Sequence, residues 1–124
     1  MNCRGVRGAI CVEENSHPAI LQATEKLLKE MISANSIRIE DIAAVVFTAT
    51  ADLDAAYPAR AARNMGWVNV PLSCMQEMNV KGSMPRCLRV LLLWNTEAKA
   101  NQIKHVYLGQ AALLRTDLTT KEEK

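Results

Sequence analysis

The chain has 124 residues, of which 49% are hydrophobic and 23% are charged. This composition excludes intrinsic disorder, and the length excludes two full-size domains. The net charge of +2, from 15 Lys and Arg against 13 Asp and Glu, argues against a nucleic-acid-binding protein, because such proteins carry a strong basic excess. Aromatic residues make up 4% of the chain, which weakens a base-stacking role as well.

The distribution of cysteines and apolar runs bears on metal binding and localisation. No apolar run approaches the ~18 residues of a membrane span, and residues 1–5 lack the apolar stretch of a signal peptide. The cysteines at positions 3, 11, 74 and 87 form no Cys-x-x-Cys motif, and the two histidines do not complete a zinc site. The sequence therefore predicts reduced thiols, no metal and a cytoplasmic protein without a membrane partner.

The first half of the chain predicts two strands around a long helix. Alternating apolar residues favour a strand over residues 3–13. Ser16 is a good N-cap and Pro18 suits a first turn, so a helix is expected from 17 to about 34, with apolar residues at three- and four-residue steps. Residues 42–49 are continuously apolar, which predicts a buried strand.

The second half predicts a short helix and three more strands. A helix is expected over residues 58–65, with Gly66 as its stop. Strands are expected over residues 68–74, 86–94 and 105–107. The order β-α-β-α-β-β-β predicts an α+β or α/β sandwich, with a mixed sheet and helices on one face.

Charged residues inside apolar strands are the informative anomaly. Arg89 lies within the run 88–93, which is otherwise fit for burial, and Arg7 lies among apolar residues near the start. A guanidinium keeps its charge, so burial requires an anion. One interpretation is a structural ion pair with Glu77. The other is an anionic small ligand, which a surplus of arginines near the strands favours: Arg4, Arg7, Arg60, Arg63, Arg86, Arg89 and Arg115.

Other polar residues carry weaker signals. Cys74 has no histidine beside it in sequence, so an inert thiol is favoured over a nucleophile. His105 fits a strand edge better than a catalytic base. Tyr107 fits either a sheet aromatic or a donor to a ligand. Arg60 and Arg63 share a helix face, which by itself is typical of a solvated surface.

Six short motifs occur in order along the chain. They are residues 4–9 (RGVRGA), 48–53 (TATADL), 58–63 (PARAAR), 74–78 (CMQEM), 85–90 (PRCLRV) and 105–108 (HVYL), the last followed by Leu114 and Arg115. In this order and spacing they resemble the trimeric, mixed α/β class of chorismate mutase and not the all-helical class. The resemblance covers about residues 2 to 118.

The resemblance implies a fold and a reaction. The fold is a single domain over residues 1–118 with a polar tail at 119–124, in which a five-stranded mixed sheet packs on one long and one short helix. Three copies form a barrel-like homotrimer with active sites between subunits. The reaction is the cofactor-free [3,3] rearrangement of chorismate to prephenate, on the route to phenylalanine and tyrosine.

The resemblance also assigns catalytic roles. Arg89 matches the arginine that contacts the breaking ether oxygen of the substrate. Arg7 and Tyr107 match the groups that hold the side-chain carboxylate. Glu77 and Cys74 match the pair near the ring hydroxyl and ring edge.

Further residues match substrate-binding positions. The neighbouring subunit contributes the wall and mouth of the site through Tyr57, Ala59, Arg60 and Arg63. Ser73 and Leu114 line the pocket, and Arg115 lies on a C-terminal segment that closes over it.

Two rival functions use the same arginines. A non-catalytic trimeric binding module for an anionic metabolite would keep the arginines but would not need Glu77. A protein associated with RNA or DNA would show a steep dependence of binding on salt, and the near-neutral charge disfavours it. The rearrangement itself needs neither proton transfer nor a nucleophile, which agrees with the lack of histidine and metal motifs.

Overall fold

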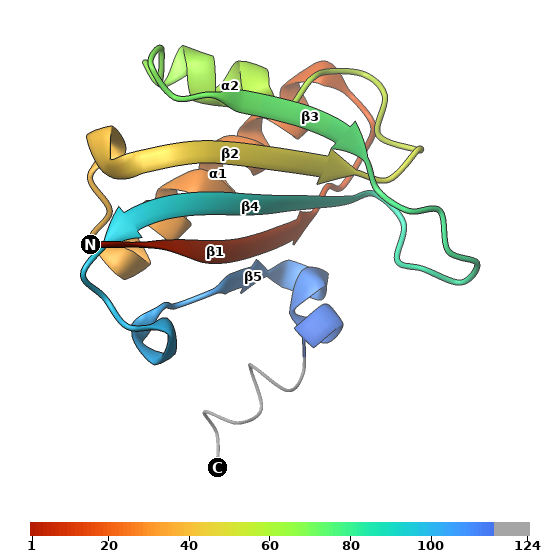
Figure 1. The fold of residues 1–124 in the computed structure, drawn as a ribbon. Helices are drawn as coiled ribbons and strands as arrows, with labels where there is room; N and C mark the ends of the chain where they lie inside the picture. Colours follow the sequence, from red (N-terminus) through yellow and green to blue (C-terminus); the bar gives the residue numbers. More distant parts are fainter. Residues whose placement is uncertain (116–124) are drawn as a thin grey trace.

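A five-stranded mixed sheet forms the centre of the computed structural model, which describes residues 1–115 (Figure 1). The strands are β1 (Asn2–Cys11), β2 (Ile42–Ala49), β3 (Leu72–Gln76), β4 (Cys87–Thr96) and β5 (Val106–Leu108). Their order across the sheet is β3-β2-β4-β1-β5. β4 pairs antiparallel with β1 and β2, whereas the outer strands β3 and β5 pair parallel with their neighbours. The predicted mixed sheet is confirmed.

The long helix α1 (His17–Asn35) begins and ends where its sequence predicts. The Ser16 hydroxyl accepts a hydrogen bond from the Ala19 N–H at 3.2 Å, and Pro18 lies in the first turn. Ser36 ends the helix in the left-handed conformation, with φ of 53°. The buried side of α1 consists of Ile20, Thr24, Leu27, Leu28 and Met31. The Thr24 hydroxyl donates to the Ile20 carbonyl at 2.7 Å, so burial leaves no polar group unpaired there.

The short helix α2 (Ala59–Asn64) packs against α1 through small side chains. Ala59, Ala61 and Ala62 are buried, whereas Arg60 and Arg63 are exposed on its outer side. Gly66 follows with φ of 88°, a conformation that glycine adopts without steric cost, so the helix stops there as predicted. Figure 1 shows α2 beside β3 at one edge of the sheet.

The core lies between the sheet and the two helices. Alternate residues of the central strands face the helices and are fully or almost fully buried: Val6, Val45, Phe47, Leu88, Val90 and Leu92. Gly8 lies on the same face, where an added Cβ would overlap with Met31 Sδ. An alanine at this position would force the buried side chains of Met31 and Leu27 to shift, so glycine suits the close approach of β1 and α1.

The opposite face of the sheet is not covered by α1 or α2. Strand β2 was predicted to be buried throughout, but only Ile42, Val45 and Phe47 are buried, because the helices cover one face alone. Leu91 of β4 lies on this open face and is 41% exposed. One protomer thus presents a partly apolar sheet face to its surroundings.

Two strand boundaries differ from the predicted ones. The third strand was expected over residues 68–74, but β3 begins at Leu72 because residues 68–70 form a turn and Pro71 has no N–H to donate. Arg86 was expected to begin β4, yet it lies outside the strand with φ of 46°. The predicted domain end at 118 and the polar tail 119–124 lie outside the described residues.

Candidate active site

Arg89 occupies the middle of the open sheet face. It lies directly opposite Ala9 of β1 on one side and Thr48 of β2 on the other. Its Nε atom lies 3.3 Å from Oε2 of Glu77, and the Thr48 hydroxyl donates to the same oxygen at 3.3 Å. Glu77 immediately follows β3, and its backbone N–H donates to the Ala49 carbonyl at 2.9 Å. The sheet therefore fixes both charged groups from β4 and β3, the two strands that flank β2.

The Arg89–Glu77 contact is an ion pair without an aligned hydrogen bond from Nε. The Nε atom is buried, yet its N–H finds no acceptor with hydrogen-bond geometry among the described residues. The side chain as a whole is 41% exposed, so part of it is accessible to a ligand. Of the two interpretations from sequence, the ion pair is present, but it leaves donors of Arg89 available to an anionic ligand.

A hollow of about 730 Å³ adjoins this ion pair, a size within the usual range of small-molecule sites. We call it the Arg89 pocket. Its polar and sulfur-bearing wall includes Thr50, Glu77, Met84, Cys87 and Arg89, and Leu114 of the 3-10 segment η3 (Gly109–Arg115) contributes an apolar side. The predicted residues Glu77, Arg89 and Leu114 thus lie around one cavity.

Arg7 and Tyr107 lie on the same face as Arg89. In the strand registers, Arg7 is opposite Leu91 of β4, and Tyr107 is opposite Ala9 of β1. Arg7 lies among apolar residues in the sequence, yet in the single protomer its side chain is exposed on the open face. The Arg7 backbone N–H donates to His105 Nδ1 at 2.9 Å, which ties β1 to the segment before β5.

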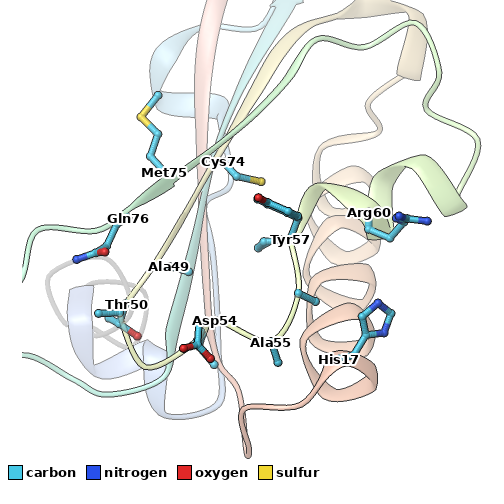
Figure 2. A pocket seen from close by; sticks show the side chains of 14 residues that line it. His17, Ala49, Thr50, Asp54, Ala55, Tyr57, Arg60, Cys74, Met75 and Gln76 are labelled. Atoms are coloured by element: carbon cyan, nitrogen blue, oxygen red, sulfur yellow. The ribbon is translucent and has the colours of Figure 1, made fainter.

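A second hollow, of about 590 Å³, lies beside α2 and the end of β3 (Figure 2). We call it the Tyr57 pocket. Tyr57, Arg60 and Cys74 line it, and Figure 2 shows the Cys74 side chain pointing toward Tyr57. Cys74 is opposite Phe47, so it lies on the helix-covered face of the sheet. The structure therefore brings Cys74 to Tyr57 and not to Glu77, with which the sequence resemblance grouped it.

The remaining predicted residues are distributed around these two pockets. Ala59 is 2% exposed and packs in the core, whereas Arg63 is exposed on α2. Ser73 is opposite Val46 and exposed on the open face. Arg115 is the last described residue, and its side chain is not described.

Two polar residues of the site were not predicted from the sequence. Thr48 donates to the Glu77 carboxylate, and Thr50 lines both pockets. Both belong to the motif 48–53, whose threonines gave the signal that could have identified them. Thr50 also accepts the Cys87 N–H through its hydroxyl at 3.0 Å, so it joins the end of β2 to β4.

Local electrostatics shift three titratable groups around the pockets. Burial raises the pKa of the Cys87 thiol, and nearby Arg89 partly offsets this effect. Burial also raises the pKa of Cys11. Hydrogen bonds from the Thr50 hydroxyl and the Arg86 N–H lower the pKa of Asp52. Within residues 1–115 there is no group of three His, Cys, Asp or Glu able to hold a metal ion, and no helix fit to cross a membrane.

Comparison with known proteins decides the family. The sequence model of chorismate mutase type I matches residues 3–118. The chain belongs to this family. It is 51% identical to chorismate mutase AroH of Thermus thermophilus over 96% of this chain and 98% of that protein. It is 43% identical to chorismate mutase AroH of Bacillus subtilis, over 96% of this chain and 94% of that one.

The fold agrees with that of a solved family member. A chorismate mutase from Clostridium thermocellum superposes with a TM-score of 0.87 at 48% identity, over 88% of this chain and 97% of that chain. The predicted α+β fold and chorismate mutase activity are confirmed by these relatives. Nothing in the comparisons favours the non-catalytic binding module.

Proposed function

We propose that the chain converts chorismate to prephenate in sites formed between the protomers of a cytoplasmic homotrimer. The observation that carries this proposal is the placement of two half-sites on one protomer. Arg89 and Glu77 lie on the open face of the sheet, whereas Tyr57, Arg60 and Cys74 lie in a pocket on the helix-covered face. A complete site then requires the open-face residues of one protomer and the Tyr57 pocket of its neighbour.

Arg89 stabilises the charge that develops during the rearrangement. As the ether bond breaks, negative charge grows on its oxygen and positive charge on the ring. A guanidinium held in place by strand β4 and by Glu77 suits the oxygen, because the donor needs no reorganisation during the reaction. The Glu77 carboxylate, held by Thr48, suits the ring side. The free donors of Arg89 allow it to bridge the ether oxygen and a carboxylate together.

Arg7 and Tyr107 restrain the flexible side chain of the substrate. Both lie on the Arg89 face, on strands β1 and β5. The planar guanidinium of Arg7 matches a carboxylate with two parallel hydrogen bonds, and the Tyr107 hydroxyl adds a donor. Holding the reacting atoms in the chair-like arrangement removes much of the entropic barrier to this intramolecular reaction.

The neighbouring protomer contributes the rest of the wall. Arg60 and Arg63 are exposed on α2, and Tyr57 is 75% exposed, so all three are available to a substrate bound at a subunit junction. On the Arg89 side, Ser73 and Leu114 add lining, and in the neighbour Ala59 supports the wall from the core. The open sheet face with Leu91 supports assembly, since a closed symmetric trimer buries it. The mechanism uses neither metal nor cofactor.

Direct conversion of chorismate tests the proposal. Purified protein is mixed with chorismate, the loss of ultraviolet absorbance is followed, and the product is identified by chromatography, with and without a chelator. We expect stoichiometric prephenate at a rate that the chelator leaves unchanged. Binding of chorismate without conversion would establish the rival binding module instead.

A further inference from the structure

Cys11 and Cys87 face each other across strands β1 and β4 in the arrangement that a disulfide requires. They are directly opposed in the antiparallel register. The next pair, Val12 and Arg86, is hydrogen-bonded, with the Val12 N–H donating to the Arg86 carbonyl at 2.8 Å. Hydrogen-bonded and non-hydrogen-bonded pairs alternate, so Cys11 and Cys87 form a non-hydrogen-bonded pair. Such pairs have Cα atoms about 4.5 Å apart, within the disulfide range of roughly 4.4–6.8 Å.

The backbone of Cys87 agrees with this assignment. Its N–H donates to the Thr50 hydroxyl at 3.0 Å, and its carbonyl accepts from the Thr50 N–H at 3.1 Å. The Cys87 peptide groups therefore point toward β2 and away from Cys11. Nothing in the β1–β4 ladder has to break for the two sulfur atoms to bond.

The thiol pair borders the Arg89 pocket. Cys87 lies two residues before Arg89 on the same face of β4 and lines the pocket. The Cys11 thiol donates to Met84 Sδ at 3.1 Å, and Met84 lines the pocket too. All four cysteines are free thiols in the structure. The pair thus joins the pocket wall to the loop that begins with Glu77.

We propose that Cys11 and Cys87 are a thiol-oxidation site at which a small-molecule disulfide is reduced and one cross-strand disulfide is formed. The thiolate of one cysteine attacks a sulfur of the small disulfide, which forms a mixed disulfide and releases one small thiolate. The thiolate of the other cysteine then attacks the protein sulfur of the mixed disulfide and releases the second small thiol. The two cysteines lose two electrons and two protons, and one disulfide becomes two thiols.

Burial and nearby charges control the rate of this exchange. Burial raises the pKa of both thiols. The charge of Arg86 lowers the pKa of Cys11, and that of Arg89 lowers the pKa of Cys87, whereas Glu77 raises the pKa of Cys87. Since only the thiolate attacks, the rate of oxidation rises with pH through the neutral and mildly alkaline range.

Oxidation changes the Arg89 pocket. The bond removes the Cys11 thiol from Met84 and fixes the Cys87 sulfur on the β1 side, away from Arg89. The expected loss of turnover rests on the proposed catalytic role of Arg89. Formation of the disulfide does not depend on that role. We expect chorismate turnover to fall by about tenfold to a hundredfold, the size of effect that a small displacement of a catalytic group produces.

The experiment treats the full chain with oxidised glutathione at graded ratios to reduced glutathione. Non-reducing peptide mapping by mass spectrometry identifies the bond, and chorismate turnover is measured before and after reduction with dithiothreitol. Cys11→Ser removes the disulfide but keeps the thiol beside Arg89. Cys3→Ser is the matched control, because Cys3 is exposed and outside the pair.

The proposal is supported if a disulfide-linked Cys11–Cys87 peptide is found in the wild type and in Cys3→Ser. Reduction must also restore the turnover of the oxidised protein, and the turnover of Cys11→Ser must resist oxidation. Glutathione adducts alone, without a Cys11–Cys87 peptide, overturn it. A mapped disulfide with unchanged turnover overturns the link to the Arg89 pocket. Failure of the reduced wild type to convert chorismate would instead overturn the proposed function, which is a separate result.

Discussion

Thr48 and Arg89 are directly opposed on β2 and β4, and one oxygen of Glu77 lies 3.3 Å from the side chains of both. The carboxylate is therefore held by a neutral donor and a cation at once. The other Glu77 oxygen accepts the Met78 N–H at 2.9 Å. This arrangement orients Arg89 before any substrate arrives, and the first predictions depend on it.

Replacing Arg89 should remove most catalysis without unfolding the chain. Arg89→Ala deletes the donor for the ether oxygen, and the loss of one such preorganised donor costs about 100- to 1,000-fold in kcat. Stopped-time assays of chorismate loss measure the effect, and circular dichroism checks the fold. Arg38→Ala is the control, since Arg38 is exposed and pairs with the adjacent Glu40. Near-normal turnover by Arg89→Ala would refute the mechanism.

Two inactive variants should complement each other if sites are shared between protomers. Arg89→Ala and Arg63→Ala damage different half-sites, so a randomly mixed trimer contains about one intact site in four, by half times half. The variants are unfolded together, refolded as a mixture and assayed beside each variant refolded alone. If the mixture is no more active than the two separately refolded samples added together, both residues belong to the site of one protomer.

The turnover rate should depend weakly on pH near neutrality. No proton moves in the rearrangement, and the proposed mechanism needs no general acid or base. We expect kcat to change by less than about twofold between roughly pH 6 and 8. Initial rates at saturating chorismate in constant-ionic-strength buffers test this. A bell-shaped profile centred near pH 7 would indicate general acid–base catalysis.

Substituting Gly8 should destabilise the fold through overpacking. The Cβ of Gly8→Ala overlaps with Met31 Sδ and meets Leu27 at 3.1 Å, and both side chains are fully buried. Overpacking of this kind costs about 1–3 kcal/mol of unfolding free energy. Gly5→Ala is the matched control, because its Cβ meets Leu91 at an ordinary 3.4 Å. Urea denaturation of both variants gives the comparison, and equal stability would contradict the packing described for β1 and α1.

Asp52 should contribute stability that is lost in acid. Hydrogen bonds from Thr50 and from the Arg86 N–H hold its pKa below the ordinary value of 3.8. A carboxyl with a lowered folded pKa stabilises the fold above its unfolded pKa, and this contribution vanishes as the pH falls through the folded value.

Asp52→Ala should therefore lower stability near pH 7 by about 1 kcal/mol or less, since the group is exposed. Thermal melts of wild type and variant at neutral and at acidic pH measure the difference. The gap between the two melting temperatures should narrow in acid, and a gap that widens there would contradict the assignment.

Local patterns predicted most of the fold. The cap at Ser16, the apolar face of α1 and the stop at Gly66 each depend on neighbouring residues, so sequence spacing was sufficient. The start of β3 was misplaced, because Val68 is apolar but lies in a turn before Pro71, which periodicity does not reveal.

The site was less accessible to pattern reasoning. Arg89 stood out because a charge in an apolar strand is rare. For Arg7 the apolar neighbours left open whether its side chain is buried, because alternation cannot show which sheet face a single protomer leaves uncovered. The placement of Cys74 on the opposite face from Arg89 follows from strand register, which joins residues far apart in the sequence.

The open sheet face has a consequence for the behaviour of the enzyme in dilute solution. Under the proposed arrangement, a lone protomer carries both halves of a site but cannot bring them to the same substrate molecule. Specific activity then follows a mass-action law in enzyme concentration, falling as subunits separate even though each remains folded. Substitution of Leu91, which is far from any bond being broken, would shift this dependence of specific activity to higher enzyme concentration.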